Sequence, residues 1–550
     1  MLVTGLLVTE SPSYHLKPMH CRALQIEVLP HQPKLLRDYV HSYDRVGAFF
    51  QHKPGLESVL AVARELEYPL ERRKEVAAAL RHQNELLGAG PATFSNLDRF
   101  EKGACAVVSG QQVGLFSGPA YAVYKALAAV RVAWELSEHG VDAVPVFWMA
   151  TEDHDLEEIR HTTFFHDGRL LDFELPQGVG NNAPVGRIQL GKDVEALGSA
   201  AAGVLGGEIA AILKECYQPE ETYASAFGRL FARLLRHAGL ILLDPLDLRL
   251  RRLAQPLFAR AVEERDVIDE ALLARDKQLE NSGYAPQVKV TARSTILFHI
   301  SREGRQVINH GGGAFASGGR QWSKQELLDA VYSEPENFSP NALFRPVVQD
   351  YLLPTVAYIG GPSEISYFAQ SEVLYRQMLG RMPVMLARAD FTLVDTKAQR
   401  LLKQYGIDVE QVWEGPQELG RRMSRASIPE NLASLLEENG GEIQKRLQQW
   451  SDAVAVLDPT LTTAVETAQK KIEYQSEKLQ QMIGRALDRK SGTLDSHQEF
   501  LSNLIYPRKA LQSRELGFLP FLARWGESLE EIGRHSGIKS SGTHFVIPMP

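Results

Sequence analysis

The amino-acid sequence predicts an α/β protein with a parallel-sheet core and a helical, coiled-coil-like arm near its C-terminus. The core is predicted because short apolar segments end in glycine-rich or acidic turns and alternate with helical segments. The arm is predicted because apolar residues recur at alternating spacings of three and four in the last quarter of the chain.

Length, charge and cysteine content narrow the class of protein. The chain has 550 residues, which is too long for one hydrophobic core and predicts about two to four folding units. Its net charge of -8 argues against nucleic acid as the main partner, because binding to phosphate backbones requires clustered Lys and Arg. The three scattered cysteines form no CxxC pair, so neither a disulfide framework nor a thiolate zinc site is expected, and a reducing cytoplasm fits. No apolar run is long enough to span a membrane.

The first hundred residues predict mainly helices, after a short apolar start that we interpret as a β-strand and not as a signal peptide. A βαβ unit follows. It comprises an apolar strand at 104–109, a glycine-rich turn at 110–118, a helix from Pro119 to about His139, and a second strand at 144–149. Such a unit implies a parallel sheet covered by helices.

Three more apolar segments are predicted to complete this sheet, namely 240–243, 355–359 and 384–386. Between them, short alternating strands are expected at about 164–190 and from 288 to 299, and the glycine-rich stretch 309–319 predicts a long loop.

The arm is marked by two apolar stripes on either side of Pro459. Their members are Ile443, Leu447, Trp450, Val454 and Leu457, then Leu461, Ala464, Ala468, Ile472, Gln475, Leu479, Met482 and Ala486. This spacing favours a coiled coil, either between the two helices or with another chain, although an ordinary helical bundle is the alternative. We therefore predict a core at 1–390 with insertions at about 164–238 and 281–335, a helical coiled-coil domain at 391–512, and a segment at 513–550 that returns to the core.

The turn after the first core strand is a candidate binding site. Glycines let backbone approach a ligand, and the N-terminus of the next helix attracts anions. The turn lacks both the GxGxxG and the P-loop patterns, and a purely structural turn is the alternative. Its candidate residues are Gly110, Gln111, Gln112, Gly114, Ser117, Gly118 and Tyr121, with Lys125 one to two turns into the helix.

The second strand ends in four consecutive polar residues, Glu152, Asp153, His154 and Asp155. Because the carboxyl ends of parallel strands line the ligand crevice, we expect them to share a cleft with the Gln111 turn. Carboxylates there could orient an amine, and a histidine could transfer a proton. Helix capping by Thr151 or Asp153 is the competing interpretation.

The strand at 355–359 ends in a similar way. Two glycines permit close backbone approach to a ligand, and Glu364 is predicted to project into the same cleft. Arg345, just before a helical segment, and Arg388, after the last core strand, are candidate anion binders, with surface ion pairs as the alternative. We include Arg345, Gly360, Gly361, Tyr367 and Arg388 among the binding residues, and we predict no protein-bound metal.

Four blocks of sequence resemble the cysteine ligase family of bacillithiol biosynthesis, the BshC family. The blocks are VVSGQQVGLFSGPAYAVYK at 107–125, VPVFWMATEDHDLEEI at 144–159, FRPVVQDYLLPTVAYIGGPSEISYF at 344–368 and PVMLAR at 383–388. The resemblance implies a Rossmann-type core with inserted connecting segments, nucleotide-binding capacity, and a coiled-coil arm that makes a homodimer. The positions corresponding to a synthetase HIGH signature read SGPA at 117–120, without histidine.

The resemblance also implies a reaction in which the carboxylate of cysteine is joined to the amine of glucosaminyl malate, giving bacillithiol. Because an amide does not form from a carboxylate in water without activation, ATP is the expected co-substrate, making an acyl-adenylate or acyl-phosphate. We expect the 110–118 turn to bind phosphate or carboxylate, Lys125 to neutralise charge, and Asp153 or Glu364 to orient the amine. The alternatives are a ligase or nucleotidylyl transferase with another amino-acid or thiol substrate, and an inactive coiled-coil scaffold.

Overall fold

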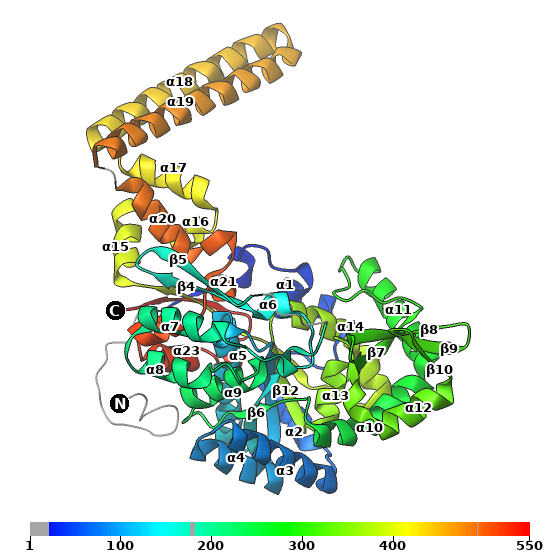
Figure 1. Ribbon diagram of the computed structural model, residues 1–550. Coiled ribbons are helices and arrows are strands. Elements are labelled where there is room, and N and C mark those ends of the chain that lie inside the picture. Colours follow the sequence, from blue (N-terminus) through cyan, green and yellow to red (C-terminus); the bar gives the residue numbers. More distant parts are fainter. Residues whose placement is uncertain (1–20, 177–181, 492) are drawn as a thin grey trace. The chain divides into compact units, whose positions relative to one another are not determined.

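The computed structural model describes residues 21–176, 182–491 and 493–550 (Figure 1). The strand predicted at the N-terminus lies outside the described residues. The chain divides into two compact units. The core unit comprises the chain up to His166, Leu170–Thr392 and Ser513–Ile547, and the arm unit comprises Asp167–Arg169, Leu393–Gln512 and Pro548–Pro550.

A five-stranded parallel sheet lies at the centre of the core unit, which confirms the predicted α/β class. Its strands are mostly apolar and are buried apart from the half-buried Gln111 at the end of the first one, as expected when helices cover both faces of a sheet. In spatial order they are β13 (Val384–Ala387), β12 (Thr355–Gly360), β2 (Cys105–Gln111), β3 (Ala143–Met149) and β6 (Ile241–Leu243).

The strand order reverses between β2 and β12. From β2 the chain continues to β3 on one side, whereas β12 pairs with the other side of β2. Register places Gln111 opposite Met149 and Gly360 opposite Ala387, so the carboxyl ends of four strands meet at one edge. In open α/β sheets, ligands bind at this kind of reversal.

Helices pack on both faces of the sheet (Figure 1). Residues of α5 (Ala120–Glu138) and α2 (Leu56–Glu65) share a hydrophobic cluster with β2, β12 and β13, in which Val132 and Leu136 lie among Val107 and Val356. Further helices of the core unit are α1 (Lys34–His41), α3 (Leu70–Leu86), α4 (Pro91–Lys102), α10 (Leu248–Glu263), α11 (Arg265–Asn281), α13 (Arg345–Leu352) and α14 (Pro362–Met378).

Two segments are inserted into this core. The first contains the hairpin β4 (His161–His166) and β5 (Arg169–Glu174), followed by α7 (Asp193–Leu205), α8 (Gly207–Cys216) and α9 (Tyr223–Leu234). The second is an antiparallel sheet in the order β10-β9-β8-β7-β11, with α12 (Lys324–Ser333) beside it. Its strands are β7 (Ser294–Ser301), β8 (Gly304–Gly311), β9 (Ala314–Ser317), β10 (Arg320–Trp322) and β11 (Phe338–Pro340).

The prediction of a long loop at 309–319 is wrong. This stretch forms strand ends joined by tight turns, because Gly312 and Gly313 both adopt positive φ angles, which glycine tolerates without steric cost. The glycines that suggested a loop therefore form the turns between antiparallel strands.

The arm unit is helical, which confirms the predicted helical region. It contains α15 (Thr396–Tyr405), α16 (Val409–Val412), α17 (Pro416–Ala426), α18 (Glu430–Leu457), α19 (Thr462–Ser491) and α20 (Leu494–Ile505). The two long helices lie side by side as a hairpin within one chain (Figure 1), while most residues of the two stripes stay exposed.

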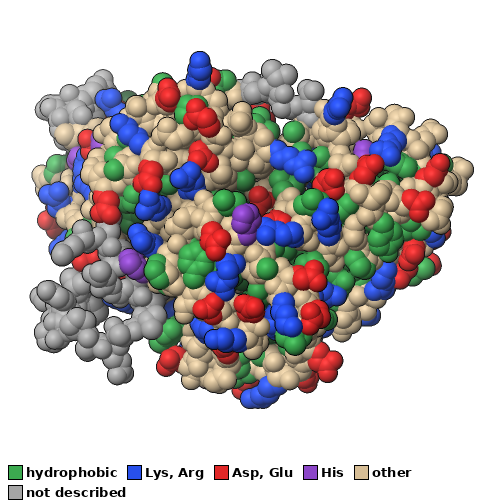
Figure 2. Space-filling model, turned by 60° about the horizontal axis from the view of Figure 1, so that its bottom comes forward, with side chains coloured by type: hydrophobic (Ala, Val, Ile, Leu, Met, Phe, Trp, Pro, Cys, Tyr) green, Lys and Arg blue, Asp and Glu red, His purple; other side chains and the backbone are tan. Residues whose placement is uncertain are grey.

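The C-terminal segment contains α21 (Gln512–Glu515), α22 (Leu519–Arg524), α23 (Ser528–Arg534) and β15 (His544–Pro548), and β15 pairs antiparallel with β1 (Arg22–Leu24). On the face shown in Figure 2, acidic and basic side chains are interspersed and are not gathered by sign. Among the described helices, none is both long and apolar enough to cross a membrane.

Candidate active site

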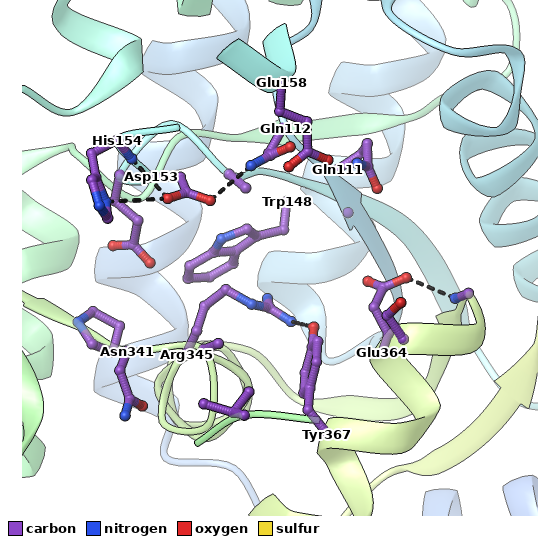
Figure 3. Close-up of a pocket in the computed structure, with 18 of the residues that line it drawn as sticks. Gln111, Gln112, Trp148, Asp153, His154, Glu158, Asn341, Arg345, Glu364 and Tyr367 are labelled. Carbon is purple, nitrogen blue, oxygen red and sulfur yellow. Dashed lines mark hydrogen bonds and ion pairs between the residues drawn. The ribbon is translucent and has the colours of Figure 1, made fainter. Parts of the chain in front are cut away.

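A cavity of about 570 Å³ lies at the carboxyl edge of the parallel sheet, at the reversal of strand order (Figure 3). The ends of β2, β3 and β12 form one wall, and the second inserted segment forms the opposite wall. Thirteen of the eighteen residues predicted for the site line this cavity. They are Gly110, Gln111, Gln112, Tyr121, Lys125, Glu152, Asp153, His154, Arg345, Gly361, Glu364, Tyr367 and Arg388.

The rest of the 110–118 turn does not reach the cavity, contrary to expectation. Ser117 is fully buried, and the ring of Phe116 packs edge-on against Tyr217 at 4.9 Å. A Cβ atom at Gly114 would lie 2.7 Å from the Cα atom of Gly118, so these glycines are needed for the turn itself.

The helix N-terminus after this turn is also occupied. The N–H of Ala120, which begins α5, donates to the carbonyl of Leu516 at 2.8 Å. An anion therefore cannot use this N–H, and the structure does not bring Gly114, Ser117 and Gly118 into the cavity with Gly110, Gln111 and Gln112.

Asp153 is anchored at one end of the cavity by neighbours that stabilise its charge. Its carboxylate accepts hydrogen bonds from Nε2 of Gln112 at 2.8 Å and from the backbone N–H of His154 at 2.7 Å. Burial alone would raise the pKa of Asp153, but hydrogen bonds from His154 and Gln112 and the charge of Arg305 hold the pKa well below its usual range. Asp153 is therefore a permanent anion at neutral pH.

The other acidic residues after β3 have different roles. Asp155 is exposed and caps α6 (Leu156–Ile159) by accepting the N–H of Glu158, so it lies outside the cavity. Glu152 forms a buried ion pair with Arg251 at 2.6 Å. The capping predicted for Thr151 or Asp153 thus belongs to Asp155, and Asp153 is left to face the cavity.

His154 lies between the carboxylate of Asp153 and an arginine from the second insertion. Its Nδ1 atom is 3.0 Å from NH1 of Arg305 and 3.4 Å from Oδ1 of Asp153. Arg305 therefore joins the inserted sheet to both side chains that follow β3.

Lys125 and Glu364 form a buried ion pair beneath the cavity. The Nζ atom of Lys125 also donates to the carbonyl of Gly110 at 2.6 Å and to Oε1 of Gln111 at 3.1 Å. Glu364 accepts from the hydroxyl of Tyr358 at 2.5 Å and from the N–H of Gly361 at 2.7 Å. Burial opposes both charges, but the pKa of Glu364 stays below its usual value because of Lys125. Both charges are partnered within the chain although both residues line the cavity; their roles in neutralising a ligand and orienting an amine stay predictions.

The two predicted anion-binding arginines differ. Arg388 pairs with Asp390 at 2.6 Å. Arg345 instead donates to Oε1 of Gln349 at 2.9 Å and to the hydroxyl of Tyr367 at 3.0 Å. Gly360, which ends β12, does not line the cavity.

Several cavity residues are not predicted by the sequence. Trp148 and Tyr358 are expected only as buried strand residues, and Glu158 follows the acidic cluster on α6. Burial raises the pKa of Glu158 despite a hydrogen bond from Gln112. Others come from distant segments and carry no local signal: Lys289, Ser294, Thr295, Phe298, Arg305, Asn341 and Arg514. Within the described part of the chain, no group of three His, Cys, Asp or Glu side chains is arranged to hold a metal ion.

Comparison with known proteins agrees with this architecture. Residues 19–389 match the family model described as "Bacillithiol biosynthesis BshC, N-terminal Rossmann-like domain", and residues 391–547 match its "C-terminal coiled-coil domain". Three relatives share the name "Putative cysteine ligase BshC". The protein from Koribacter versatilis is 40% identical over 91% of this chain and 94% of its own length. The proteins from Solibacter usitatus and Salinibacter ruber are 37% and 31% identical, covering 93% and 94% of this chain and 96% of each relative. The chain therefore belongs to the BshC family of bacillithiol biosynthesis.

Proposed function

We propose that this protein is the ligase that joins the carboxylate of cysteine to the amine of glucosaminyl malate, forming bacillithiol. Relatives over nearly the whole chain are named as cysteine ligases. The observation that carries the proposal is the anchored, ionised carboxylate of Asp153 inside a cavity at the strand-order reversal. An amine substrate arrives largely as ammonium at neutral pH, and a fixed carboxylate binds and orients that charge.

Asp153 and Glu158 have different proposed roles: Asp153 binds the ammonium group, and Glu158 accepts its proton. A carboxylate whose pKa is held far below neutrality binds an ammonium group well but accepts its proton poorly. Glu158 lines the same cavity and contacts the same Gln112, and burial raises its pKa, which makes it the better proton acceptor. Glu158 first takes a proton from the ammonium, which gives the nitrogen its lone pair. The neutral amine then attacks the activated carbonyl carbon, the leaving group departs with its bonding electrons, and the second N–H proton is released to the leaving group or to solvent.

Activation of the cysteine carboxylate is assigned to ATP, bound as its Mg²⁺ complex. The turn before α5 does not fit phosphate, because the first N–H of that helix is already occupied. Lys289 and Arg514 on the cavity wall supply positive charge instead. The residues present therefore fit a nucleotide over the cavity wall better than at the helix N-terminus.

The arm is proposed to form a homodimer with a second copy of this chain. Although α18 and α19 pack against each other, most of the apolar stripe remains exposed, including Trp450 at 65% and Leu479 at 50%. Exposed apolar side chains in a continuous helical stripe are typical of a surface that a partner helix covers.

Metabolite profiling of a deletion strain tests the proposed reaction. We expect loss of bacillithiol with accumulation of glucosaminyl malate, both reversed by a plasmid copy of the gene. Unchanged bacillithiol in the deletion strain would contradict the proposed function.

A further inference from the structure

Arg305 belongs to β8 of the inserted sheet, and its guanidinium is held in one orientation by the neighbouring strands. Nε donates to Oγ of Ser339 at 2.9 Å, and NH2 donates to the carbonyl of Pro340 at 2.7 Å, both on β11. The guanidinium carbon lies 4.0 Å from the ring centroid of Phe298 on β7. A planar guanidinium that is bonded along one edge and stacked on one face has little freedom to turn.

The remaining nitrogen, NH1, faces the residues that follow β3. It lies 3.0 Å from Nδ1 of His154 and 3.8 Å from Oδ1 of Asp153. The side chain of Arg305 is 7% exposed, whereas that of Asp153 is 36% exposed. Figure 3 shows the Asp153 carboxylate between His154 and Gln112, which both contact it. A buried cation therefore lies beside a carboxylate that is open to the cavity, and solvent screens that cation little.

The other charges around this pair leave Arg305 available to Asp153. Glu152 also attracts Arg305, but its carboxylate is paired with Arg251 at 2.6 Å, and both of these side chains are almost fully buried. From α6, Glu158 lines the same cavity and carries the same sign of charge as Asp153. Arg305 thus offsets the repulsion that a second carboxylate brings to the site.

We propose that Arg305 is a positioning residue, through which the inserted sheet holds the carboxylate of Asp153 in the place where it binds the ammonium group of the amine substrate. This inference rests on the proposed ligase function and assigns a role in it to the second insertion. Arg305 acts through Asp153, because its N–H groups are directed at Ser339, Pro340 and His154.

A double-mutant cycle on turnover is the sharpest test. Arg305→Ala should lower kcat/KM for glucosaminyl malate about tenfold to a hundredfold, the scale of a misplaced active-site group. The loss should be smaller than that of Asp153→Asn, because Gln112 and the N–H of His154 still hold the carboxylate. In the Asp153→Asn background, Arg305→Ala should change kcat/KM by less than about twofold. A loss of equal size in both backgrounds would show that Arg305 acts independently of Asp153, which overturns the proposal.

Conservative replacement and chemical rescue give a second readout. Arg305→Lys keeps the charge but loses the planar fork, so it should retain part of the turnover. Millimolar guanidinium ions, which fit the space left in Arg305→Ala, should restore part of its turnover but none in Arg305→Ala/Asp153→Asn. Equal stimulation of both proteins would contradict a role through Asp153.

Two controls address folding and charge. Arg305→Gln removes the charge but keeps a long polar side chain, and it is carried through the same cycle so that the test does not depend on the folding of Arg305→Ala. Arg302→Ala removes an exposed arginine from the turn between β7 and β8, outside the cavity lining, and should leave kcat/KM unchanged.

Melting temperatures separate this inference from the proposed reaction, because they require no substrate. Asp153→Asn alone should change the melting temperature little. Added to Arg305→Ala, it should raise the melting temperature by about 1–2 °C, since it removes a carboxylate that has lost its cationic neighbour. If wild-type protein forms no bacillithiol yet this pattern appears, the reaction fails and the link between Arg305 and Asp153 stands. If Asp153→Asn shifts both backgrounds equally, the positioning role fails whatever the reaction is.

Discussion

Nζ of Lys125 on α5 and the carboxylate of Glu364 on α14 form an ion pair in which both side chains are largely buried, at 2% and 17% exposure. The pair joins the helix that follows β2 to the helix that follows β12, on either side of the strand-order reversal. Both residues line the cavity, and each charge is neutralised by the other.

Lys125→Met is expected to destabilise the protein as well as reduce turnover. Removing one member of a buried pair leaves the other charge uncompensated, at a cost of about 3–5 kcal/mol. Urea unfolding of the core transition measures this loss. The double variant Lys125→Met/Glu364→Gln should recover much of it, and a single variant as stable as wild type would contradict the structural role.

The pair of His535 and Glu531 predicts a pH-dependent contribution to stability. Hydrogen bonds with Cys21 and Glu531 raise the pKa of His535 from 6.5 to about 9, and the ring lies 3.2 Å from the Glu531 carboxylate. A histidine whose pKa is higher in the folded than in the unfolded state contributes its full stabilisation below the unfolded-state pKa. This contribution is lost as the pH rises through the folded-state pKa. The stability difference between wild type and His535→Gln should therefore be present at about pH 6, on the order of 1 kcal/mol after solvent screening, and vanish above about pH 9.5.

Unfolding curves for wild type and His535→Gln at these two pH values show whether the stability difference falls with increasing pH, as predicted. A difference that grows with increasing pH would contradict this assignment of the histidine charge.

The apolar stripe of the arm predicts how the dimer can be separated. Trp450→Glu combined with Leu479→Glu places charges on the exposed stripe and should yield a folded monomer by light scattering. Gln448→Glu, an exposed position of α18 off the stripe, is the matched control and should remain dimeric. Deletion of 440–490 should also give a monomer, and a dimer that persists in these proteins would locate the interface elsewhere.

The parallel strands can be predicted from sequence because buried strands are continuous apolar runs bounded by glycine or acidic turns. The same logic predicts that Gln112 and Asp153 share one cleft, and their side chains are in fact hydrogen-bonded to each other. Strand ends carry position-specific information that does not depend on knowing how distant segments pack.

Pairings between distant segments cannot be predicted in this way. Arg305 lies on the second insertion and Asn341 directly follows its last strand, and no local pattern distinguishes either from a surface residue. The sequence indicates Lys125 and Glu364 as separate ligand-binding groups, but their mutual pairing depends on how α5 and α14 pack. The 110–118 turn is misleading because glycines that let a ligand approach also let a turn pack closely. The carbonyl of Leu516, which accepts the first N–H of the next helix, favours the packing role and comes from a distant segment.

The turnover of Asp153→Asn tests whether the Asp153 carboxylate binds the amine substrate. Asp155, and not Asp153, caps α6, so the substitution leaves that helix capped and should change the melting temperature little. Gln112→Ala, which removes the hydrogen bond to Asp153, should reduce turnover in the same direction. Purified wild-type and Asp153→Asn proteins are compared for bacillithiol formation from cysteine, glucosaminyl malate and ATP by mass spectrometry. We expect Asp153→Asn to lose turnover on the order of 10²-fold or more. Turnover by Asp153→Asn within a few-fold of wild type would contradict it.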